Sequence, residues 1–296
     1  MATPLEIACH LNVVVESLAA PQLDATLARL AELGYSAIVL EPVDPSAVDA
    51  AALAARFAAH GLTAIPLAGQ SPAADVSSAD TEVRRAGAAA LTRMVEFAEQ
   101  LGSDQLNGVP YGLFRATTGP TAADAFARSA VEVGRVADLA AARGITMTFE
   151  VVNRYEVSML NTAAQALAYV AASESAALRI HLDTFHMAIE EADSAAALVA
   201  AVPKLGYLEL GQSGRGRLAT GSVDVDALVR TAIAAGYTGR IGIEAFRRPG
   251  LPSSVADLLA IWRDPYVDGI DLAAEAMHLI RNAGAGAGTF TSQDAP

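Results

Sequence analysis

The sequence predicts a single α/β domain, a (β/α)8 TIM barrel, because short apolar segments alternate with longer amphipathic ones along most of the chain. The chain has 296 residues, of which 53% are hydrophobic, so a large core can form. Repeated β/α units without a change in composition favour parallel strands that close on themselves. An open doubly wound sheet is the alternative, but residues 9–14 lack the glycine-rich phosphate-binding turn typical of that fold.

Eight apolar segments of four to eight residues are expected to form the strands, because strands covered on both faces are apolar throughout. They are residues 6–13, 37–41, 63–68, 105–109, 146–152, 178–183, 207–210 and 240–246.

Seven longer segments carry apolar residues at spacings of three and four, the pattern of a helix with one buried face. They are residues 23–33, 51–59, 82–101, 122–143, 163–172, 194–201 and 225–235. Glycines follow several of them, where a left-handed residue ends a helix at little cost. We therefore expect a barrel domain over residues 1–282 and a flexible glycine-rich tail over residues 283–296.

The charge composition argues against several partners. The net charge is −13, and Lys204 is the only lysine, so binding to nucleic acid or to an anionic membrane surface is not expected. One cysteine, Cys9, excludes an internal disulfide and a cysteine-built zinc site. Neither a signal peptide nor a membrane-spanning segment is recognisable. We expect a cytoplasmic protein.

Four carboxylates stand on four consecutive predicted strands, near the strand ends where barrel enzymes place their sites. They are Glu150, Asp183, Glu209 and Glu244, each among apolar neighbours. One such residue is usually a satisfied core group, but four at one barrel mouth repel one another unless a cation lies between them. All-oxygen ligands suit Mg²⁺ or Mn²⁺ better than zinc.

Histidines and loop charges leave more than one interpretation open. His181 lies two residues before Asp183 and is either a ligand or a hydrogen-bonding partner of the site. His186, in the following loop, is expected to face the substrate. His10 either lines the pocket or packs in the core. Arg215 lies among glycines that allow a loop to approach a ligand closely.

At these residues the sequence resembles the xylose isomerase-like TIM barrels, and within them the ketose 3-epimerases of the D-tagatose/D-psicose type. The likeness is densest in Glu150-Val-Val-Asn-Arg-Tyr-Glu156, Asp183-Thr-Phe-His-Met187 and Glu244-Ala-Phe246. It implies that Glu150 and Glu244 are metal ligands and also the acid/base pair, moving a proton at C3 through an enediolate. Asp183 would be a further ligand.

The same resemblance implies that Glu156, His186 and Arg215 hydrogen-bond the sugar. The ion would be Mn²⁺ or Mg²⁺, with Co²⁺ as another option, and no further cofactor is implied. One position departs from the family: Glu209 stands where a histidine ligand is usual. We expect Glu209 to be a ligand, because its strand neighbours Leu208 and Leu210 point away when it points into the barrel.

Three functions are therefore considered. The first is ketose 3-epimerisation, or aldose–ketose isomerisation by the same route. The second is a lyase or hydro-lyase acting on a keto-cyclitol or 3-keto glycoside, with a hetero-oligomer as one form of assembly. The third is a non-catalytic sugar-binding subunit. The family resemblance also implies a homodimer or homotetramer. Specificity would depend on loop residues such as Tyr111, Phe114 and Trp262.

Overall fold

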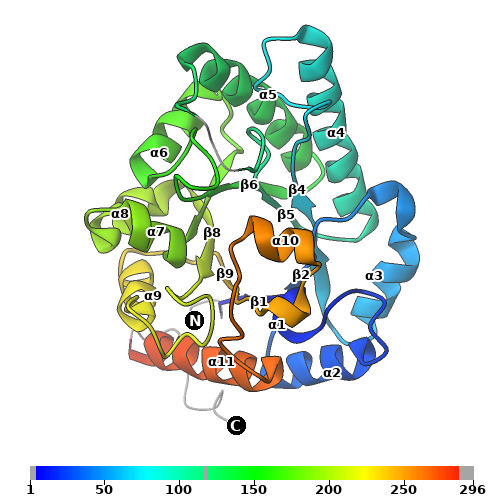
Figure 1. The fold of residues 1–296 in the computed structure, drawn as a ribbon, viewed down its shortest axis with the longest axis vertical. Helices are drawn as coiled ribbons and strands as arrows, with labels where there is room; N and C mark the ends of the chain where they lie inside the picture. Colours follow the sequence, from blue (N-terminus) through cyan, green and yellow to red (C-terminus); the bar gives the residue numbers. More distant parts are fainter. Residues whose placement is uncertain (1–4, 116–118, 287–296) are drawn as a thin grey trace.

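The computed structural model describes residues 5–115 and 119–286, and in them nine parallel strands form a nearly closed barrel ringed by helices (Figure 1). The strands are β1 (Ile7–His10), β2 (Ala37–Val39), β3 (Thr63–Ile65), β4 (Leu67–Ala68), β5 (Gln105–Gly108), β6 (Thr146–Val151), β7 (Arg179–Asp183), β8 (Leu205–Leu210) and β9 (Arg240–Ile243). Their order around the sheet is β3-β2-β1-β9-β8-β7-β6-β5-β4. The TIM barrel predicted from the sequence is thus confirmed.

The ninth strand arises from an interruption of the predicted strand 63–68 at Pro66. Proline has no N–H to donate to a ladder, so one regular strand cannot run through it. The first half, β3, pairs with β2, whereas the second half, β4, pairs with β5. The Pro66 carbonyl still accepts from the Asn107 amide (3.1 Å), and this bond carries the pairing across the break. The prediction of one continuous strand over residues 63–68 was therefore wrong, but both observed strands lie within these residues.

Helices surround the strands, and most lie where the periodicity predicted them. Those of the outer ring are α2 (Leu23–Leu33), α3 (Ala50–Ala58), α4 (Thr81–Gln100), α5 (Ala123–Ala141), α6 (Ala163–Ala172), α8 (Ser194–Ala201), α9 (Val225–Ala234) and α11 (Gly269–Gly286). Side-chain caps define several of their starts: Asp80 accepts from the amides of Glu82 and Val83, and Thr162 forms a capping box with Gln165.

Shorter helices lie in the loops at the strand ends. They are α1 (Leu11–Val14), α7 (Thr184–Glu190) and α10 (Ser253–Leu258), with single 3₁₀ turns at Pro45–Ala47, Val202–Lys204 and Arg248–Gly250. Helix α1 occupies residues that the sequence assigned to the end of the first strand. Helix α10 lies across the near end of the barrel (Figure 1).

The last helix, α11, has no counterpart among the predicted helices. It continues to Gly286, beyond the expected domain boundary at residue 282, and it packs beside α2 and α9. Residues 287–296 of the expected tail lie outside the described residues. No helix in the described part of the chain is long and apolar enough to cross a membrane.

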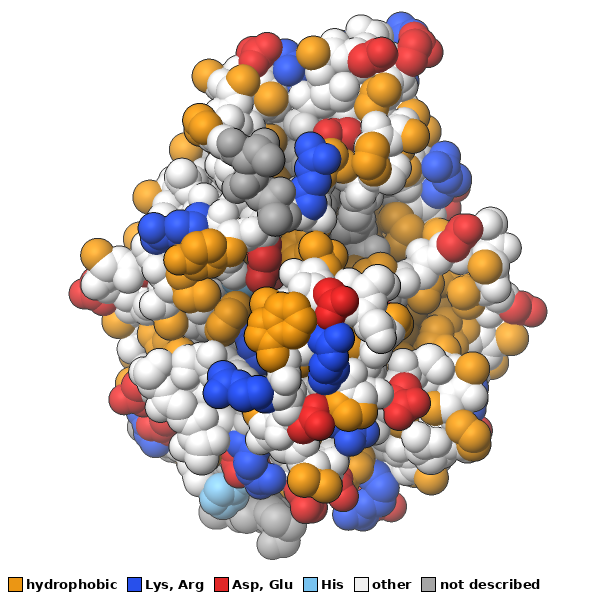
Figure 2. Space-filling view, viewed as in Figure 1, with side chains coloured by type: hydrophobic (Ala, Val, Ile, Leu, Met, Phe, Trp, Pro, Cys, Tyr) orange, Lys and Arg blue, Asp and Glu red, His pale blue; other side chains and the backbone are white. Residues whose placement is uncertain are grey.

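The opposite end of the barrel is closed by Arg240. Its guanidinium pairs with Asp104 (3.0 Å) and Glu6 and donates to Gln105 Oε1 (3.1 Å). These contacts connect residues at the N-terminal ends of β1, β5 and β9. Figure 2 shows the face of the molecule that α10 crosses, where basic and acidic side chains are dispersed and a hollow opens near the middle.

Gly108, the last residue of β5, approaches the backbone of β4 closely, and this approach yields a stability prediction. Its φ is +115°, and an added Cβ would lie 2.2 Å from the Ala68 carbonyl oxygen. Gly108→Ala should lower the free energy of unfolding by about 3 kcal/mol, from backbone strain and overpacking together. Gly144→Ala is the matched control, since its φ is +76° with nothing within 4 Å of the new Cβ. It should cost about 1 kcal/mol. Equal losses in urea denaturation would contradict the close approach.

Candidate active site

The four carboxylates singled out in the sequence come together at the C-terminal end of the barrel. Glu150 lies on β6, Asp183 ends β7, Glu209 lies on β8, and Glu244 follows β9 directly. Asp183 and Glu209 are opposite each other in the β7–β8 register, and both are fully buried. The buried Glu209 side chain contacts His10 and His181, so it points into the barrel mouth as strand alternation predicts.

Basic side chains stand between these carboxylates on one side of the barrel mouth. His186 Nε2 lies 3.3 Å from Glu150 Oε1 and 3.7 Å from Asp183 Oδ2. Arg215 Nη1 lies 3.0 Å from Asp183 Oδ2, and its other terminal nitrogen donates to Glu244. A basic group therefore bridges each of the two carboxylate pairs.

Two further histidines bridge the carboxylates on the other side. His10 Nε2 lies 2.9 Å from Glu209 Oε1, and its Nδ1 lies 3.5 Å from Glu244 Oε1. His181 Nε2 lies 3.0 Å from Glu209 Oε2, and donor atoms of His181, Glu209 and Glu150 lie within 4.8 Å of one another.

Together these eight residues form an alternating arrangement that we call the charged ring. In order around the mouth its members are Glu150, His186, Asp183, Arg215, Glu244, His10, Glu209 and His181.

Glu209 is held as an anion by two histidines of the charged ring. Burial opposes its ionisation, but His10 and His181 outweigh burial and lower the pKa of Glu209 far below its ordinary value. The effect is mutual: burial alone would lower the pKa of His10, whereas Glu209 and Glu244 raise it to about 10. An imidazolium held between two carboxylates is the charge state that this geometry favours.

Glu244 differs from Glu209 because its burial dominates. Burial raises the pKa of Glu244 to about 8, although Arg215 and His10 act in the opposite direction. Burial also acts to lower the pKa of the Arg215 guanidinium. The carboxylates of Glu244 and Asp183 outweigh burial and raise this pKa. Arg215 therefore stays a cation between two carboxylates.

The proton position on His186 is determined by a backbone amide. The Asn153 N–H donates to His186 Nδ1 (3.1 Å), so Nδ1 must offer a lone pair and the ring proton lies on Nε2, facing Glu150. His186 is thus neutral in this arrangement. Burial acts to lower its pKa, but the neighbouring Glu150 and Asp183 outweigh burial and raise it. Asn153 also donates to Glu156 Oε1 (3.0 Å), which brings Glu156 to the edge of the charged ring.

The loop after β8 presents Arg215 in a stacked and constrained position. Its guanidinium carbon lies 4.1 Å from the Phe185 ring centre and 4.6 Å from that of Phe246. Its φ is +53°. The close approach requires glycine at position 211, where a Cβ would lie 2.7 Å from Asp183 Oδ1 and 2.8 Å from Arg215 Nη1. Gly211 therefore has a geometric reason, whereas a Cβ at Gly214 would meet nothing within 4 Å.

The donor set of the charged ring fits a divalent cation. Donor atoms lie within 4.8 Å of one another in three triads: His10, Glu209 and Glu244; Glu150, His181 and Glu209; and Glu150, Asp183 and His186. Neither buried oxygen of Glu209 has an aligned hydrogen bond in the described structure, so both have lone pairs free for a cation. Each triad contains a histidine, whereas the set expected from the sequence contained carboxylates alone.

Sequence reasoning left two members of the charged ring undecided. His10 was equally consistent with lining the pocket and with packing, and His181 with a ligand and with a hydrogen-bonding partner. Only contacts across strands show that both lie against Glu209. Of the proposed specificity residues, Tyr111 is fully buried, whereas Trp262 is 65% exposed and lies under Arg248. Asn12 and Glu41, not singled out before, carry buried polar atoms without hydrogen bonds in the described residues.

Comparison with known proteins gives a consistent family. Residues 27–282 match the family described as xylose isomerase-like TIM barrel. The chain is 37% identical over 278 residues to a ketose 3-epimerase of Arthrobacter globiformis, covering 94% of this chain and 96% of that protein. It is also 37% identical over 277 residues to an L-ribulose 3-epimerase of Mesorhizobium japonicum, covering 93% and 92%.

Solved structures agree with these sequence matches. A structure of L-ribulose 3-epimerase superposes with a TM-score of 0.89 at 33% identity, covering 99% of this chain and 100% of that chain. A D-allulose 3-epimerase from Methylomonas sp. in complex with D-allulose superposes with a TM-score of 0.89 at 32% identity, covering 95% and 97%.

The raised pKa of His10 predicts how the stability of the metal-free protein depends on pH. A histidine whose folded pKa is raised contributes stability that is full below the unfolded value of about 6.5 and is lost as pH rises to the folded value. The folded value is about 10. In EDTA-treated protein the free energy of unfolding should therefore fall between pH 6.5 and pH 10, and His10→Gln should reduce that slope. The exposed His278→Gln is the control. A slope unaffected by His10→Gln would refute the imidazolium bridge.

Proposed function

The chain belongs to the xylose isomerase-like TIM barrel family, and from this premise we propose that it epimerises ketoses at C3. The relatives named above act on ketoses by their names, and their likeness extends over nearly the whole chain. Those names favour an isomerase over the lyase and the sugar-binding subunit considered from the sequence.

The observation that carries the proposal is the placement of Glu150 and Glu244 across the charged ring. β7 and β8 separate the strands that present them, and Asp183 and Glu209 lie between them on either side. Inversion at one carbon without a redox cofactor requires a base on one face and an acid on the other. Two carboxyl groups facing each other across one opening meet that requirement.

In the proposed reaction one glutamate removes the C3 proton, the sugar becomes an enediolate, and the other glutamate returns a proton to the opposite face. Glu156, His186 and Arg215 would hydrogen-bond the sugar near its carbonyl end. The His186 proton on Nε2 and the Arg215 guanidinium are donors, and Glu156 is an acceptor. These contacts would orient C3 between the two glutamates.

A divalent ion completes the proposal. Mn²⁺ or Mg²⁺, with Co²⁺ as another option, would be held by Glu150, Asp183, Glu209 and Glu244 and would supply Lewis acidity that makes the C–H next to the carbonyl more acidic. Because the resemblance places a histidine where Glu209 stands, this chain would hold the ion with one more carboxylate. The proposal also includes a cytoplasmic location and a homodimer or homotetramer.

The first test of the function follows deuterium. With Mn²⁺ in heavy water, the protein should convert L-ribulose or D-allulose to its C3 epimer and place deuterium at C3. Glu150→Gln and Glu244→Gln should each lower kcat by about 10² to 10⁴, because the proton acceptor is lost while the shape is kept. Glu82→Gln, an exposed change on α4, is the control. Absence of C3 deuterium in every ketose, or near-normal kcat of metal-loaded Glu244→Gln, would overturn the assignment.

A second test concerns the ion and Glu209. Elemental analysis should find one divalent ion per chain, and chelation should lower Tm, because an ion that binds only the folded state stabilises it. Glu209→His should strengthen binding of Zn²⁺ and Co²⁺ relative to Mg²⁺, since imidazole suits softer ions. Glu82→His serves as the control. Titrations with an unchanged order of affinities would mean that Glu209 does not contact the ion.

A further inference from the structure

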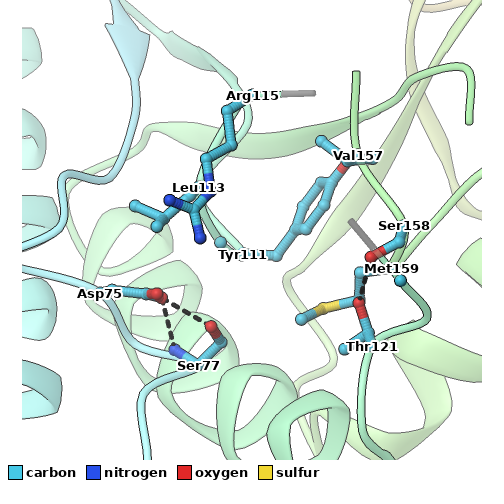
Figure 3. Close-up of a pocket in the computed structure, with 11 residues that line it drawn as sticks. Asp75, Ser77, Tyr111, Leu113, Arg115, Thr121, Val157, Ser158 and Met159 are labelled. Carbon is cyan, nitrogen blue, oxygen red and sulfur yellow. Dashed lines mark hydrogen bonds between the residues drawn. The ribbon is translucent and has the colours of Figure 1, made fainter. Parts of the chain in front are cut away.

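A cavity of about 430 Å³ lies at the same end of the barrel as the charged ring, but it is separate from the ring (Figure 3). The loops after β4, β5 and β6 line it, and its described lining includes neither a member of the ring nor Glu156. Tyr111, fully buried and edge-on to Phe149 of β6, stands between the cavity and the ring. The groups that contact the rest of a substrate held in the ring therefore come from another side of the mouth.

Under the proposed function, the carbonyl end of the ketose lies on one side of the mouth. Its hydrogen-bonding residues, Glu156, His186 and Arg215, follow β6, β7 and β8. Strand β2 lies across the barrel from β7, because four strand positions separate them in either direction when the interrupted β3 and β4 count as one. A ketose whose carbonyl end is held there, with C3 between Glu150 and Glu244, extends its remaining carbons toward β1 and β2.

Strand alternation directs Glu41, which follows β2, into this side of the mouth. One apolar layer lies inside the barrel and consists of Ala8, Ala37, Val39, Ile65 and Tyr207. Two positions after a member of this layer, three strands carry a polar residue: His10, Glu41 and Glu209. The Leu40 amide still donates to the Ile65 carbonyl (2.8 Å), so strand pairing continues up to the residue before Glu41. Because alternate residues of a strand face the same side, Glu41 faces inward as His10 and Glu209 do.

Asn12, in the short helix after β1, lies next to Glu41. The β1–β2 register places His10 opposite Val39, so Asn12 and Glu41 each follow one of these partners by two positions, nearer to the opening. Burial raises the pKa of Glu41, while His10 and a hydrogen bond from the Asn12 backbone N–H act to lower it. Glu209 adds to the increase. The Glu41 carboxylate therefore borders both Asn12 and the charged ring.

The side chains of Asn12 and Glu41 have hydrogen-bonding capacity that the described residues do not use. Asn12 is 3% exposed, and neither its Oδ1 nor its Nδ2 has a hydrogen-bond partner there; the same holds for the buried Oε1 of Glu41. A buried polar group without a partner costs free energy, which a ligand can recover. One hydroxyl group can donate to the carboxylate and accept from the carboxamide, whereas a phosphate would be repelled by the carboxylate.

We propose that Asn12 and Glu41 bind the terminal hydroxyl group of the ketose, the one farthest from its carbonyl. The hydroxyl donates to Glu41 and accepts from the Asn12 amide, while C3 reacts at the charged ring. The inference rests on the proposed function and narrows its substrates to ketoses that carry a free terminal hydroxyl rather than a phosphate or a methyl group. It makes Asn12 and Glu41 specificity-determining residues.

The main test compares D-allulose, 6-deoxy-D-allulose and 1-deoxy-D-allulose on the Mn²⁺-loaded protein, by deuterium incorporation at C3. The unchanged protein should favour D-allulose over the 6-deoxy sugar by about tenfold in kcat/KM, the effect of one hydrogen bond to a charged group. Glu41→Met should lower kcat/KM about tenfold for D-allulose and 1-deoxy-D-allulose and leave that of the 6-deoxy sugar unchanged. Glu16→Met, an exposed change in the following loop, is the control. In calorimetry, D-allulose 6-phosphate should bind more weakly than D-allulose.

A second readout uses stability without sugar. Asn12→Leu should raise Tm by about 3 °C, because it removes a buried amide that has no partner, and should weaken D-allulose binding. Asn107→Leu is the matched contrast, since Asn107 is equally buried but accepts from Gln105 Nε2 (2.7 Å) and Thr148 Oγ1 (2.8 Å). It should lower Tm, because those donors lose their acceptor.

The outcomes separate this proposal from the function on which it rests. If no ketose gains deuterium but D-allulose binds more tightly than its 6-deoxy form in a Glu41-dependent way, the function fails and the terminal-hydroxyl contact stands. If both sugars react equally well, the function stands and the contact is refuted. A loss in Glu41→Met that is equal for all three sugars would place the effect in the ring and overturn the proposal. A Tm lowered in Asn12→Leu as in Asn107→Leu would give Asn12 a structural role and overturn its assignment.

Discussion

Four largely buried carboxylates converge in the mouth of one barrel, and their mutual repulsion is the constraint to which the rest of the site responds. Like charges this close cannot all remain ionised unless opposite charges stand between them. The chain meets the constraint by alternating acidic and basic side chains, so that Arg215 bridges two of the carboxylates and His10 bridges two others. The bridges come from β1 and from the loop after β8. Neutralisation therefore depends on the barrel being closed.

The bridges are not equivalent, and the differences determine what each side chain can do. His10 lies between two carboxylates and is held as a cation, whereas the Asn153 amide keeps His186 neutral with its proton toward Glu150. Arg215 is stacked between two phenylalanine rings. A divalent ion bound by the carboxylates would take over part of the charge balance that these groups provide. Metal affinity and histidine protonation are therefore linked in this site.

The charged ring and a separate cavity lie at the same end of the barrel. Strands β6, β7, β8 and β1, together with the segments that follow β7, β8 and β9, present the charged ring, whereas the loops after β4 to β6 line a separate cavity. The interruption at Pro66 lets one chain segment pair with β2 and then with β5, and so closes the barrel beneath that cavity.

The sequence by itself determined the barrel, seven of its helices and the position of Glu150, Asp183, Glu209 and Glu244, because periodicity and strand alternation are local properties. It did not reveal the break at Pro66 or helix α11, whose partners α2 and α9 lie far away in the chain. Nor could it decide whether His10 packs or lines the pocket, which role His181 has in the site, or show Arg215 between Asp183 and Glu244. Those roles are contacts between residues up to 234 positions apart, and only closure of the barrel brings such residues within a few ångströms. Local patterns set which residues face inward, and tertiary structure decided which of them meet.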